Sequence, residues 1–362
     1  MKILILYTYN KGLLSEFFQE LSEKLYSDGF DVDNFYLKNK SVFFTQNGVS
    51  IYGEKRRGFF SNYKAIYKVI KHSQPDVVIS NFSYINPAVL FGKLLGVKRN
   101  IAWFHTAFGH TKPNLLKVWN KTVYLNMADV VLANSKSLQH EMHSVYKVSK
   151  EKIKRVPFWT NIVNYQNDTH ALPIERSGDI INIGCPGRLV ADKNHSLVIR
   201  AMHQLKQSRE QLFHLYIAGS GIYEHQLQQL VKKLNLEQDV TFLGLLDVSA
   251  MTEFYKTMDV VVLPSLHEAF GLVFIETIAL GTPVLVSNAF GALSFIDVEK
   301  FPLEDFCFNP ESIQELINKL SLFIETKGLK SQYFKFMYEQ TFEKEHIYNQ
   351  IKSIILDQNG TT

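Results

Sequence analysis

Short apolar segments alternate with amphipathic helical patterns along most of this chain, and this alternation constrains the fold more than any other feature of the sequence. A strand, a helix and a further strand in succession are typical of parallel sheets that helices cover on both faces. The strands expected in the first half are 2–8, 31–37, 76–80, 100–106, 129–135 and 153–158. Those expected in the second half are 179–185, 212–218, 240–243, 259–263 and 283–286. The sequence therefore predicts an α/β protein.

The length of 362 residues fits two domains better than one. Between residues 161 and 178 the apolar periodicity gives way to a polar stretch that contains Pro173, which makes this stretch the best linker candidate. We therefore predict an N-terminal domain over 1–165 and a C-terminal domain over 175–340. After Pro310 the pattern is helical, and Thr341–Leu356 carries an apolar stripe.

Cysteine usage and hydropathy indicate a cytoplasmic protein. Cys185 and Cys307 are too few for a disulfide framework, and the first residues predict a strand rather than a signal peptide. No apolar run approaches the roughly 20 residues that a membrane-spanning helix needs. We also expect no nucleic-acid partner.

Opposite charges divide the chain between its two halves. Residues 1–165 contain 23 lysines and arginines against 11 acidic residues, whereas the remainder contains 16 against 24. Basic and aromatic residues gather at 55–60, at Lys64, Lys68 and Lys71, and at 112–121. Such clusters fit contact with an anionic membrane surface. A solvated face and a site for an acidic glycan are the alternatives.

Two glutamates, Glu268 and Glu276, flank a predicted strand-to-helix turn. The strand 259–263 is followed by a helical pattern over 270–280. Backbone N–H groups near Phe270, Gly271 and Leu272 would then face an incoming phosphate, which the helix dipole also favours. Alternatively, both glutamates coat a solvated helix.

Two further loops follow predicted strands of the same sheet. One contains Arg188 and Lys193, and the other contains Gly219 and Gly221. The carboxyl ends of parallel strands share one edge, so three loops would gather there. Arginine offers a planar fork to phosphate oxygens and lysine adds a point charge. Position 224 is Glu, so the third glycine of a dinucleotide-binding motif is absent.

These loops resemble those of the retaining nucleotide-sugar glycosyltransferases of the GT-B fold, specifically the large family 4. The matching elements are Arg-x4-Lys at 188–193, Gly-x-Gly at 219–221 and Glu-x7-Glu at 268–276. The resemblance implies two Rossmann-like domains that face each other across a cleft. It also implies that a final helix, about 343–362, returns to the first domain.

The resemblance implies a role for each of these residues. Arg188 and Lys193 would hold the donor diphosphate, and Gly219 and Gly221 would let the nucleotide approach the backbone. Glu276 would accept hydrogen bonds from the ribose hydroxyls, and Glu268 would lie near the donor sugar. His105, at the end of an expected strand, would lie near the transferred sugar. Neither glutamate is expected to be a covalent nucleophile. No metal is expected, because Arg, Lys and a helix end replace the cation.

We therefore expect a retaining hexosyltransferase-type enzyme that uses a nucleotide-sugar donor and a glycan or lipid-linked acceptor. It would act in cell-surface polysaccharide or glycolipid biosynthesis, as a cytoplasmic protein peripheral to the inner membrane face. The alternative is a non-catalytic GT-B subunit that binds sugar nucleotide or a partner transferase. An epimerase or phosphorylase on the same fold is a third option.

Overall fold

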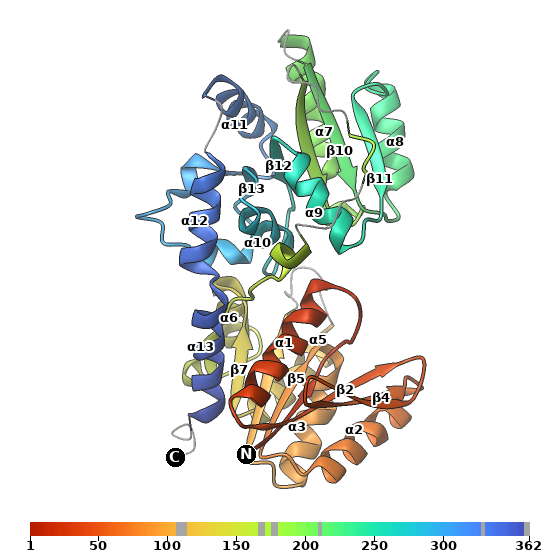
Figure 1. Cartoon of the computed structure of the whole chain (residues 1–362), viewed down its shortest axis with the longest axis vertical. Coiled ribbons are helices and arrows are strands. Elements are labelled where there is room, and N and C mark those ends of the chain that lie inside the picture. The colour runs from red at the N-terminus through yellow and green to blue at the C-terminus, as the bar shows by residue number, and fades with distance from the viewer. Residues whose placement is uncertain (106–113, 166–170, 175–179, 209–211, 327–329, 358–362) are drawn as a thin grey trace. The chain divides into compact units, whose positions relative to one another are not determined.

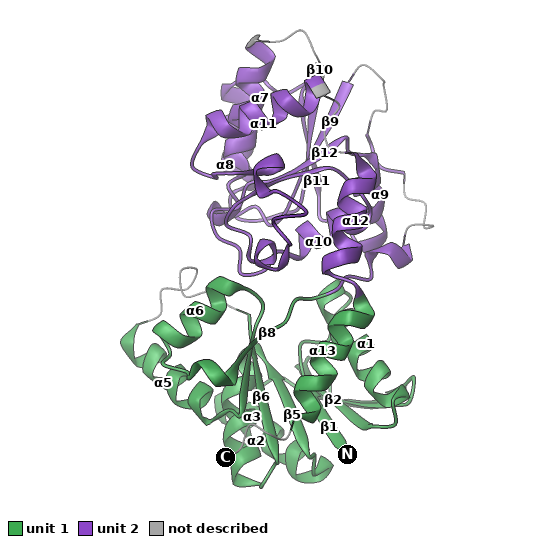
Figure 2. Cartoon of the chain, turned by 90° about the vertical axis from the view of Figure 1, so that its left-hand side faces the viewer, with its two compact units in different colours: residues 1–158, 344–362 green, residues 159–343 purple. Residues whose placement is uncertain are grey.

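The computed structural model describes residues 1–105, 114–165, 171–174, 180–208, 212–326 and 330–357. It divides into two compact units, shown in Figure 2. Unit 1 comprises Met1–Phe158 and Lys344–Thr362, and unit 2 comprises Trp159–Glu343. The chain passes into unit 2 before residue 165, the boundary expected from the sequence. The reason is that the short helix η3 (Ile162–Tyr165) packs against two helices of unit 2, α9 (Val248–Thr257) and α10 (Leu272–Ala279).

Unit 1 is built on an eight-stranded sheet with the order β3-β4-β2-β1-β5-β6-β7-β8. Every neighbouring pair is parallel except β3 and β4. The strands are β1 (Lys2–Leu6), β2 (Asp31–Lys38), β3 (Val42–Gln46), β4 (Val49–Lys55), β5 (Val77–Asn81), β6 (Arg99–Phe104), β7 (Val130–Ala133) and β8 (Ile153–Arg155). Its helices are α1 (Leu13–Ser27), α2 (Phe59–Ser73), α3 (Ile85–Leu94), α5 (Leu115–Met127), α6 (Lys136–Ser144) and α13 (Lys344–Leu356).

The strands of unit 1 are buried on both faces. Ile3 and Leu4, successive residues of β1, are both fully buried although their side chains point to opposite faces. On one face Leu4 belongs to a core with residues of α2 and α3. Helix covering of both faces explains why these strands are continuous apolar runs rather than alternating ones.

The sequence interpretation did not include the antiparallel hairpin of β3 and β4. Asn47 and Gly48 connect the two strands and both have positive φ angles, 47° and 84°. An Asn-Gly pair between short strands is a strong hairpin signal, so this hairpin could have been predicted.

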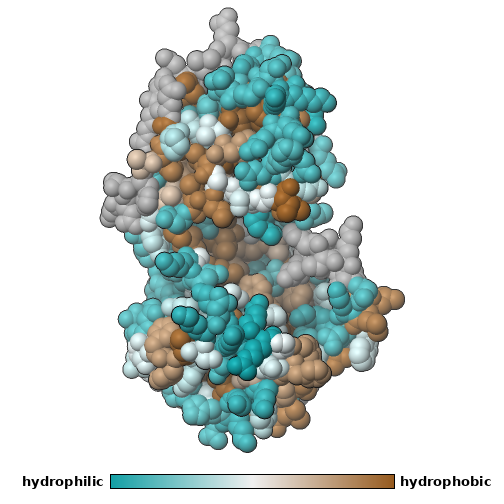
Figure 3. Space-filling view, turned by 90° about the vertical axis from the view of Figure 1, so that its right-hand side faces the viewer, coloured by the Kyte–Doolittle hydropathy of each residue, from teal (hydrophilic) through white to brown (hydrophobic). Residues whose placement is uncertain are grey.

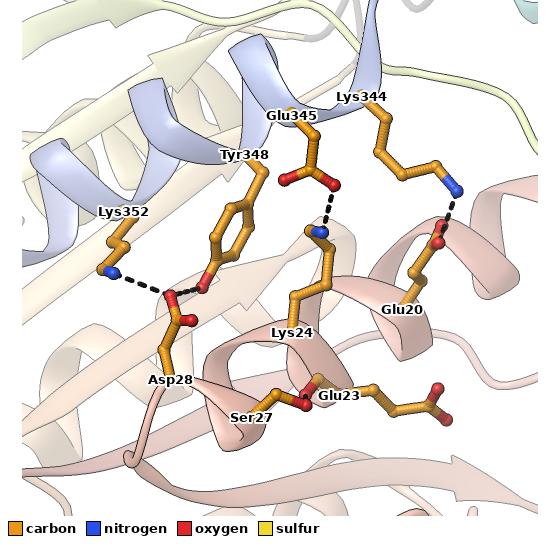
Figure 4. A network of polar contacts seen from close by, with 9 residues as sticks. All are labelled: Glu20, Glu23, Lys24, Ser27, Asp28, Lys344, Glu345, Tyr348 and Lys352. Carbon is orange, nitrogen blue, oxygen red and sulfur yellow. Dashed lines mark hydrogen bonds and ion pairs between the residues drawn. The ribbon is translucent and has the colours of Figure 1, made fainter.

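Helix α13 returns to unit 1 and lies beside α1 (Figure 1, Figure 4). Ile347, Ile351 and Ile355 of α13 are buried. Charged side chains flank this apolar contact: Lys344 pairs with Glu20 at 2.5 Å, Glu345 with Lys24 at 2.5 Å, and Lys352 with Asp28 at 2.7 Å. The apolar stripe seen in the sequence is therefore the face that α13 buries within unit 1.

Unit 2 is built on a six-stranded parallel sheet with the order β11-β10-β9-β12-β13-β14. Its strands are β9 (Ile180–Pro186), β10 (Leu212–Ala218), β11 (Val240–Gly244), β12 (Val260–Leu263), β13 (Val284–Ser287) and β14 (Cys307–Phe308). Its helices are α7 (His195–Ser208), α8 (Glu224–Lys233), α9 (Val248–Thr257), α10 (Leu272–Ala279), α11 (Ile313–Thr326) and α12 (Ser331–Thr341). Each unit is Rossmann-like, which confirms the predicted fold class.

Candidate functional site

The loops that follow β9, β10, β12 and β13 are joined to one another at the carboxyl edge of the unit 2 sheet. We call the residues 187–193, 219–221, 264–271 and 288–292 the loop belt. Its parts are held together by backbone hydrogen bonds from Leu189 N to Ser220 O (2.9 Å), Leu266 N to Asp192 O (2.8 Å), Gly291 N to Glu268 O (3.1 Å) and Ala292 N to Phe270 O (2.9 Å). The loops predicted from the sequence to meet at one edge are therefore in direct contact.

Gly219 and Gly221 pack against the loop that carries Arg188. A Cβ atom on Gly219 would lie 1.9 Å from the carbonyl oxygen of Gly187, and one on Gly221 would lie 2.3 Å from that of Leu189. Both distances are far below van der Waals contact. These glycines therefore allow the Arg188 loop to pack closely against the loop that contains them. Their approach to a nucleotide stays a prediction.

Arg188 and Lys193 lie in different electrostatic surroundings. Arg188 is exposed, and within the described residues its guanidinium has no ion-pair partner. Lys193, in the short helix η4 (Ala191–Lys193), pairs through Nζ with Glu268 Oε2, and both side chains are less than one fifth exposed. The structure therefore joins two predicted site residues, whereas the third, Arg188, is exposed and unpaired among the described residues.

Helix α10 begins in the belt without a side-chain cap. Gly271 is its N-cap residue with φ of 101°, and a Cβ atom there would lie 2.2 Å from the Phe290 ring. Phe270 is buried and its ring contacts Phe295 and Phe342, so only its backbone is available at the belt. Leu272 is the first residue of the helix. An uncapped helix start has backbone N–H groups suited to an anion.

Glu276 is buried in the second turn of α10. Its Oε2 accepts a hydrogen bond of 2.9 Å from the hydroxyl of Tyr255 on α9. Burial raises the pKa of Glu276 to about 7, and the Tyr255 hydrogen bond acts in the opposite direction. The sequence interpretation did not include Tyr255, because nothing in the spacing of α9 marks it as a partner of a residue 21 positions later.

His195, another residue not singled out from the sequence, lies beneath the Arg188 loop. It is buried, and its ring Nε2 would be 3.7 Å from a Cβ atom on Gly187. Neither ring nitrogen has a hydrogen-bond partner within the described part of the chain. Burial, together with the smaller effect of the nearby Lys193 charge, lowers the pKa of His195 to about 4. The ring is therefore a neutral packing element under the belt.

His105 belongs to unit 1, directly after β6. Its Nδ1 lies 2.8 Å from Asn134 Oδ1 and its Nε2 lies 2.7 Å from Asn81 Oδ1. Burial lowers the pKa of His105 to about 4, and the contact with Asn134 opposes that shift. Both ring nitrogens thus face asparagines that the sequence interpretation did not single out. Each of the two asparagines stands at the end of a strand, and that position was the available signal.

Two family models match most of this chain. Residues 175–340 match the model of glycosyl transferases group 1, and residues 15–161 match that of Glycosyltransferase Family 4. The chain belongs to the group 1 glycosyltransferases. The first match contains the whole loop belt, and the second contains His105 and both of its asparagines.

Several relatives of this group 1 glycosyltransferase are themselves described only as glycosyltransferases. An uncharacterized one from Haemophilus influenzae is 24% identical over 325 residues, or 86% of each chain. Another from Methanocaldococcus jannaschii is 32% identical over 195 residues, which span 51% of this chain and 48% of the relative. The O-antigen biosynthesis glycosyltransferase WclY of Escherichia coli is 29% identical over 48% of each chain. The chain thus spans about half the length of two of these relatives.

Solved structures share the fold at low sequence identity. HepE of Anabaena in complex with UDP superposes with a TM-score of 0.77 over 98% of this chain and 99% of that one, at 18% identity. Sucrose-phosphate synthase of Thermosynechococcus elongatus gives a TM-score of 0.75 over 98% of both chains, at 20% identity. These likenesses support the GT-B fold of this group 1 glycosyltransferase.

The surface of unit 1 carries exposed apolar side chains beside lysines and arginines, and Figure 3 shows brown side chains among teal ones on that unit. The most exposed are Phe60 (86%), Leu115 (87%) and Leu116 (76%), and the exposed Phe59 and Trp119 belong to the same helices. They lie on α2 and α5, which both pack against α3. No helix in the described residues is long and apolar enough to cross a bilayer.

One lysine of the predicted basic clusters is partly buried. Lys121 donates to Asn86 Oδ1 at 3.2 Å and lies 5.4 Å from the centre of the Phe104 ring. Burial lowers the pKa of Lys121 to about 8. Lys112 lies outside the described residues. The exposed basic residues of this surface are therefore those around Lys55–Arg57, together with Lys64, Lys68, Lys71 and Lys117.

Proposed function

We propose that this group 1 glycosyltransferase moves a hexose or related sugar from a nucleotide-sugar donor to a glycan or lipid-linked acceptor, with retention of configuration. The observation that carries the proposal is the composition of the loop belt. An exposed guanidinium at Arg188, which has no ion-pair partner among the described residues, a lysine at Lys193 that Glu268 holds in place, and the uncapped start of α10 occur together at one sheet edge. Such a set suits the charge that develops on a departing diphosphate.

The acceptor class and the pathway are inferred from relatives. WclY is named for O-antigen biosynthesis, and HepE structures contain UDP or UDP-glucose. A uridine nucleotide is therefore the first donor to test. We propose that Arg188, Lys193 and the α10 N-terminus neutralise the diphosphate without a metal ion. In the described residues, no group of three or more His, Cys, Asp or Glu side chains is arranged to hold one.

The two glutamates are proposed to divide the work of donor recognition. Glu268 orients Lys193 and lies in the belt, so it is assigned to the sugar end of the donor. Glu276 is buried with Tyr255, and it is assigned to the ribose hydroxyls. Reaction on one face of the sugar, with the leaving phosphate taking the acceptor's proton, would require positioning rather than a protein nucleophile.

Calorimetry with nucleoside diphosphates, followed by donor hydrolysis and transfer assays, tests this function. Arg188→Ala should weaken diphosphate binding by about 10- to 150-fold, which corresponds to one lost charge-assisted contact of about 1.5–3 kcal/mol. Arg200→Ala, which removes an exposed arginine of α7, is the matched control and should bind normally. Equal affinity of wild type and Arg188→Ala would refute the assignment. Normal binding without hydrolysis or transfer of any donor would instead favour a non-catalytic subunit.

We further propose that unit 1 associates reversibly with anionic membranes through the exposed residues of α2 and α5 and through the basic segment Lys55–Arg57 that precedes α2. Each juxtamembrane cation contributes about 1 kcal/mol near an acidic leaflet, and salt weakens the attraction. Vesicle co-sedimentation of a variant with Lys55, Arg56 and Arg57 changed to Ser should show reduced pelleting on anionic lipid. Changing Lys147, Lys150 and Lys154 to Ser removes the same charge elsewhere on unit 1 and should leave pelleting unchanged. Equal losses in both variants would mean that only net charge matters.

A further inference from the structure

A hydrogen-bonded network spans five neighbouring strands at the carboxyl edge of the unit 1 sheet, with His105 at its centre. Asn81, the last residue of β5, donates through Nδ2 to Leu6 O at the end of β1, at 3.1 Å. Asn134, directly after β7, donates through Nδ2 to Val156 O just beyond β8, at 2.7 Å. Both amides direct Oδ1 at the imidazole between them. The order of the network follows the order of the strands, β1-β5-β6-β7-β8.

The neighbours of each asparagine determine which way its amide points. If Asn134 were turned over, its oxygen would face Val156 O, and its amino group would face the Trp103 Nε1 donor that now lies 3.0 Å from Oδ1. If Asn81 were turned over, its oxygen would face Leu6 O. Both alternatives place like groups against each other, so both oxygens are committed to His105.

Aromatic rings hold the faces of the same imidazole. Trp103 and Phe158 stack on it with interplanar angles of 28°, and Phe82 lies 4.6 Å from it between ring centroids. The described groups against the ring are aromatic or amide, with no carboxylate or ammonium among them. The ring is therefore fixed in its plane by the asparagines and across its faces by the aromatic side chains.

We propose that Asn81 and Asn134 are positioning residues that clamp the His105 ring, so that neither ring nitrogen is offered to the substrate. This inference rests on the proposed function, and it refines the role of His105. The groups of His105 that remain available to a substrate are then its ring carbons and its backbone, and both are held in one fixed orientation. A protonated ring would donate to both oxygens and a neutral ring to one, so both acceptors favour the protonated form while burial opposes it.

The clamp can be tested on the free protein, without any substrate. Among the 12 histidines, the ring signals of His105 are identified in ¹⁵N-histidine NMR spectra by their loss in His105→Gln. We expect one fixed protonation state in the wild type, and displaced ring signals in Asn81→Ala and in Asn134→Ala. Averaged tautomers in the wild type, or ring signals that neither variant displaces, would overturn the proposal.

Two further variants separate clamping from general loss of packing. Asn81→Asp keeps an acceptor for the ring but loses the donor to Leu6 O, so the His105 signals should stay fixed in a single state. Asn100→Ala removes a buried asparagine from the opposite end of β6, where its side chain contacts Val97 O and Asp129. It should lower stability without moving the His105 signals. Displacement of those signals by Asn100→Ala to the same extent as by Asn81→Ala would contradict a specific clamp.

A double-mutant cycle connects the clamp to turnover. Asn81→Ala and Asn134→Ala should each lower kcat roughly 10- to 100-fold with little change in the donor KM, since misplacing a positioned group costs that much. In a His105→Ala background neither substitution should lower kcat further. Additive losses in that background would show that the asparagines act independently of His105. If no donor is turned over at all, the proposed function fails, but the NMR result still decides the clamp.

Discussion

The carboxyl edges of the two sheets are held together by different kinds of contact. In unit 2, backbone hydrogen bonds join the loops, and glycines let one loop pack closely against the next. The Arg188 side chain is exposed and makes no ion pair with the residues that the structure describes. In unit 1, the side chains of Asn81, His105 and Asn134 join the strand ends. Where backbone contacts join the loops, few residue types can replace the glycines. Where side chains join the strand ends, each contact can be removed separately by one substitution.

Gly219→Ala should have the largest effect, because it attacks the backbone packing of unit 2 directly. Its φ of 147° is unfavourable for alanine, and the added Cβ would lie 1.9 Å from a backbone oxygen that cannot rotate away. We expect a loss of about 3 kcal/mol or more in the free energy of unfolding, together with weaker diphosphate binding as the Arg188 loop shifts. Denaturant unfolding and calorimetry measure the two effects.

Gly244→Ala is the matched control for that substitution. Gly244 also has a positive φ, 69°, but a Cβ atom there would meet nothing within 4 Å. It should therefore lose only about 1 kcal/mol. Similar losses in the two variants would mean that backbone strain, rather than contact between loops, sets the requirement for glycine at 219.

The difference between the two edges also explains what the sequence could predict. Glycines and charged residues at fixed offsets from strand ends led to the loop belt, since backbone geometry restricts which residues can stand there. Asn81 and Asn134 also stand at strand ends, but an asparagine at such a position does not indicate its partner, and Tyr255 lies inside a helix. Each acquires its partner only when strands or helices distant in sequence become neighbours. The fold class was predictable from alternation alone, and the pairing of Lys193 with Glu268 was not.

An effect of intermediate size is expected at Glu276, a buried carboxyl group of unit 2 that accepts a hydrogen bond from the Tyr255 side chain. Its pKa is raised from 4.5 to about 7, so the native state binds the proton more tightly than the unfolded chain does. Its ionisation therefore reduces stability as pH rises from about 4.5 to 7, and the loss is complete above pH 7. Glu276→Gln should gain about 2 kcal/mol over wild type at pH 8 relative to pH 5, measured by denaturant unfolding.

The same variant should bind nucleoside diphosphates more weakly if the carboxylate receives the ribose hydroxyls. Stability gained together with affinity lost would mark Glu276 as a group kept for binding rather than for folding. Glu299→Gln, which neutralises an exposed carboxylate of unit 2, should change neither quantity. A Glu276→Gln variant with no pH-dependent gain would show that the buried carboxylate is compensated in the native state.

The smallest effect is expected where charged side chains fasten α13 to unit 1 (Figure 4). Lys352 and Asp28 are each about one third exposed, so their pair should contribute less than about 1 kcal/mol and should weaken in high salt. Ile351 on the same helix is 1% exposed, and Ile351→Ala should cost about 2–5 kcal/mol with little dependence on salt. Unfolding of Lys352→Met and Ile351→Ala at low and high salt therefore ranks the two kinds of contact. A larger loss of unfolding free energy in Lys352→Met than in Ile351→Ala would mean that the ion pairs, rather than the buried isoleucines, hold this helix. Side-chain charges would then stabilise unit 1 as strongly as backbone contacts stabilise the loops of unit 2.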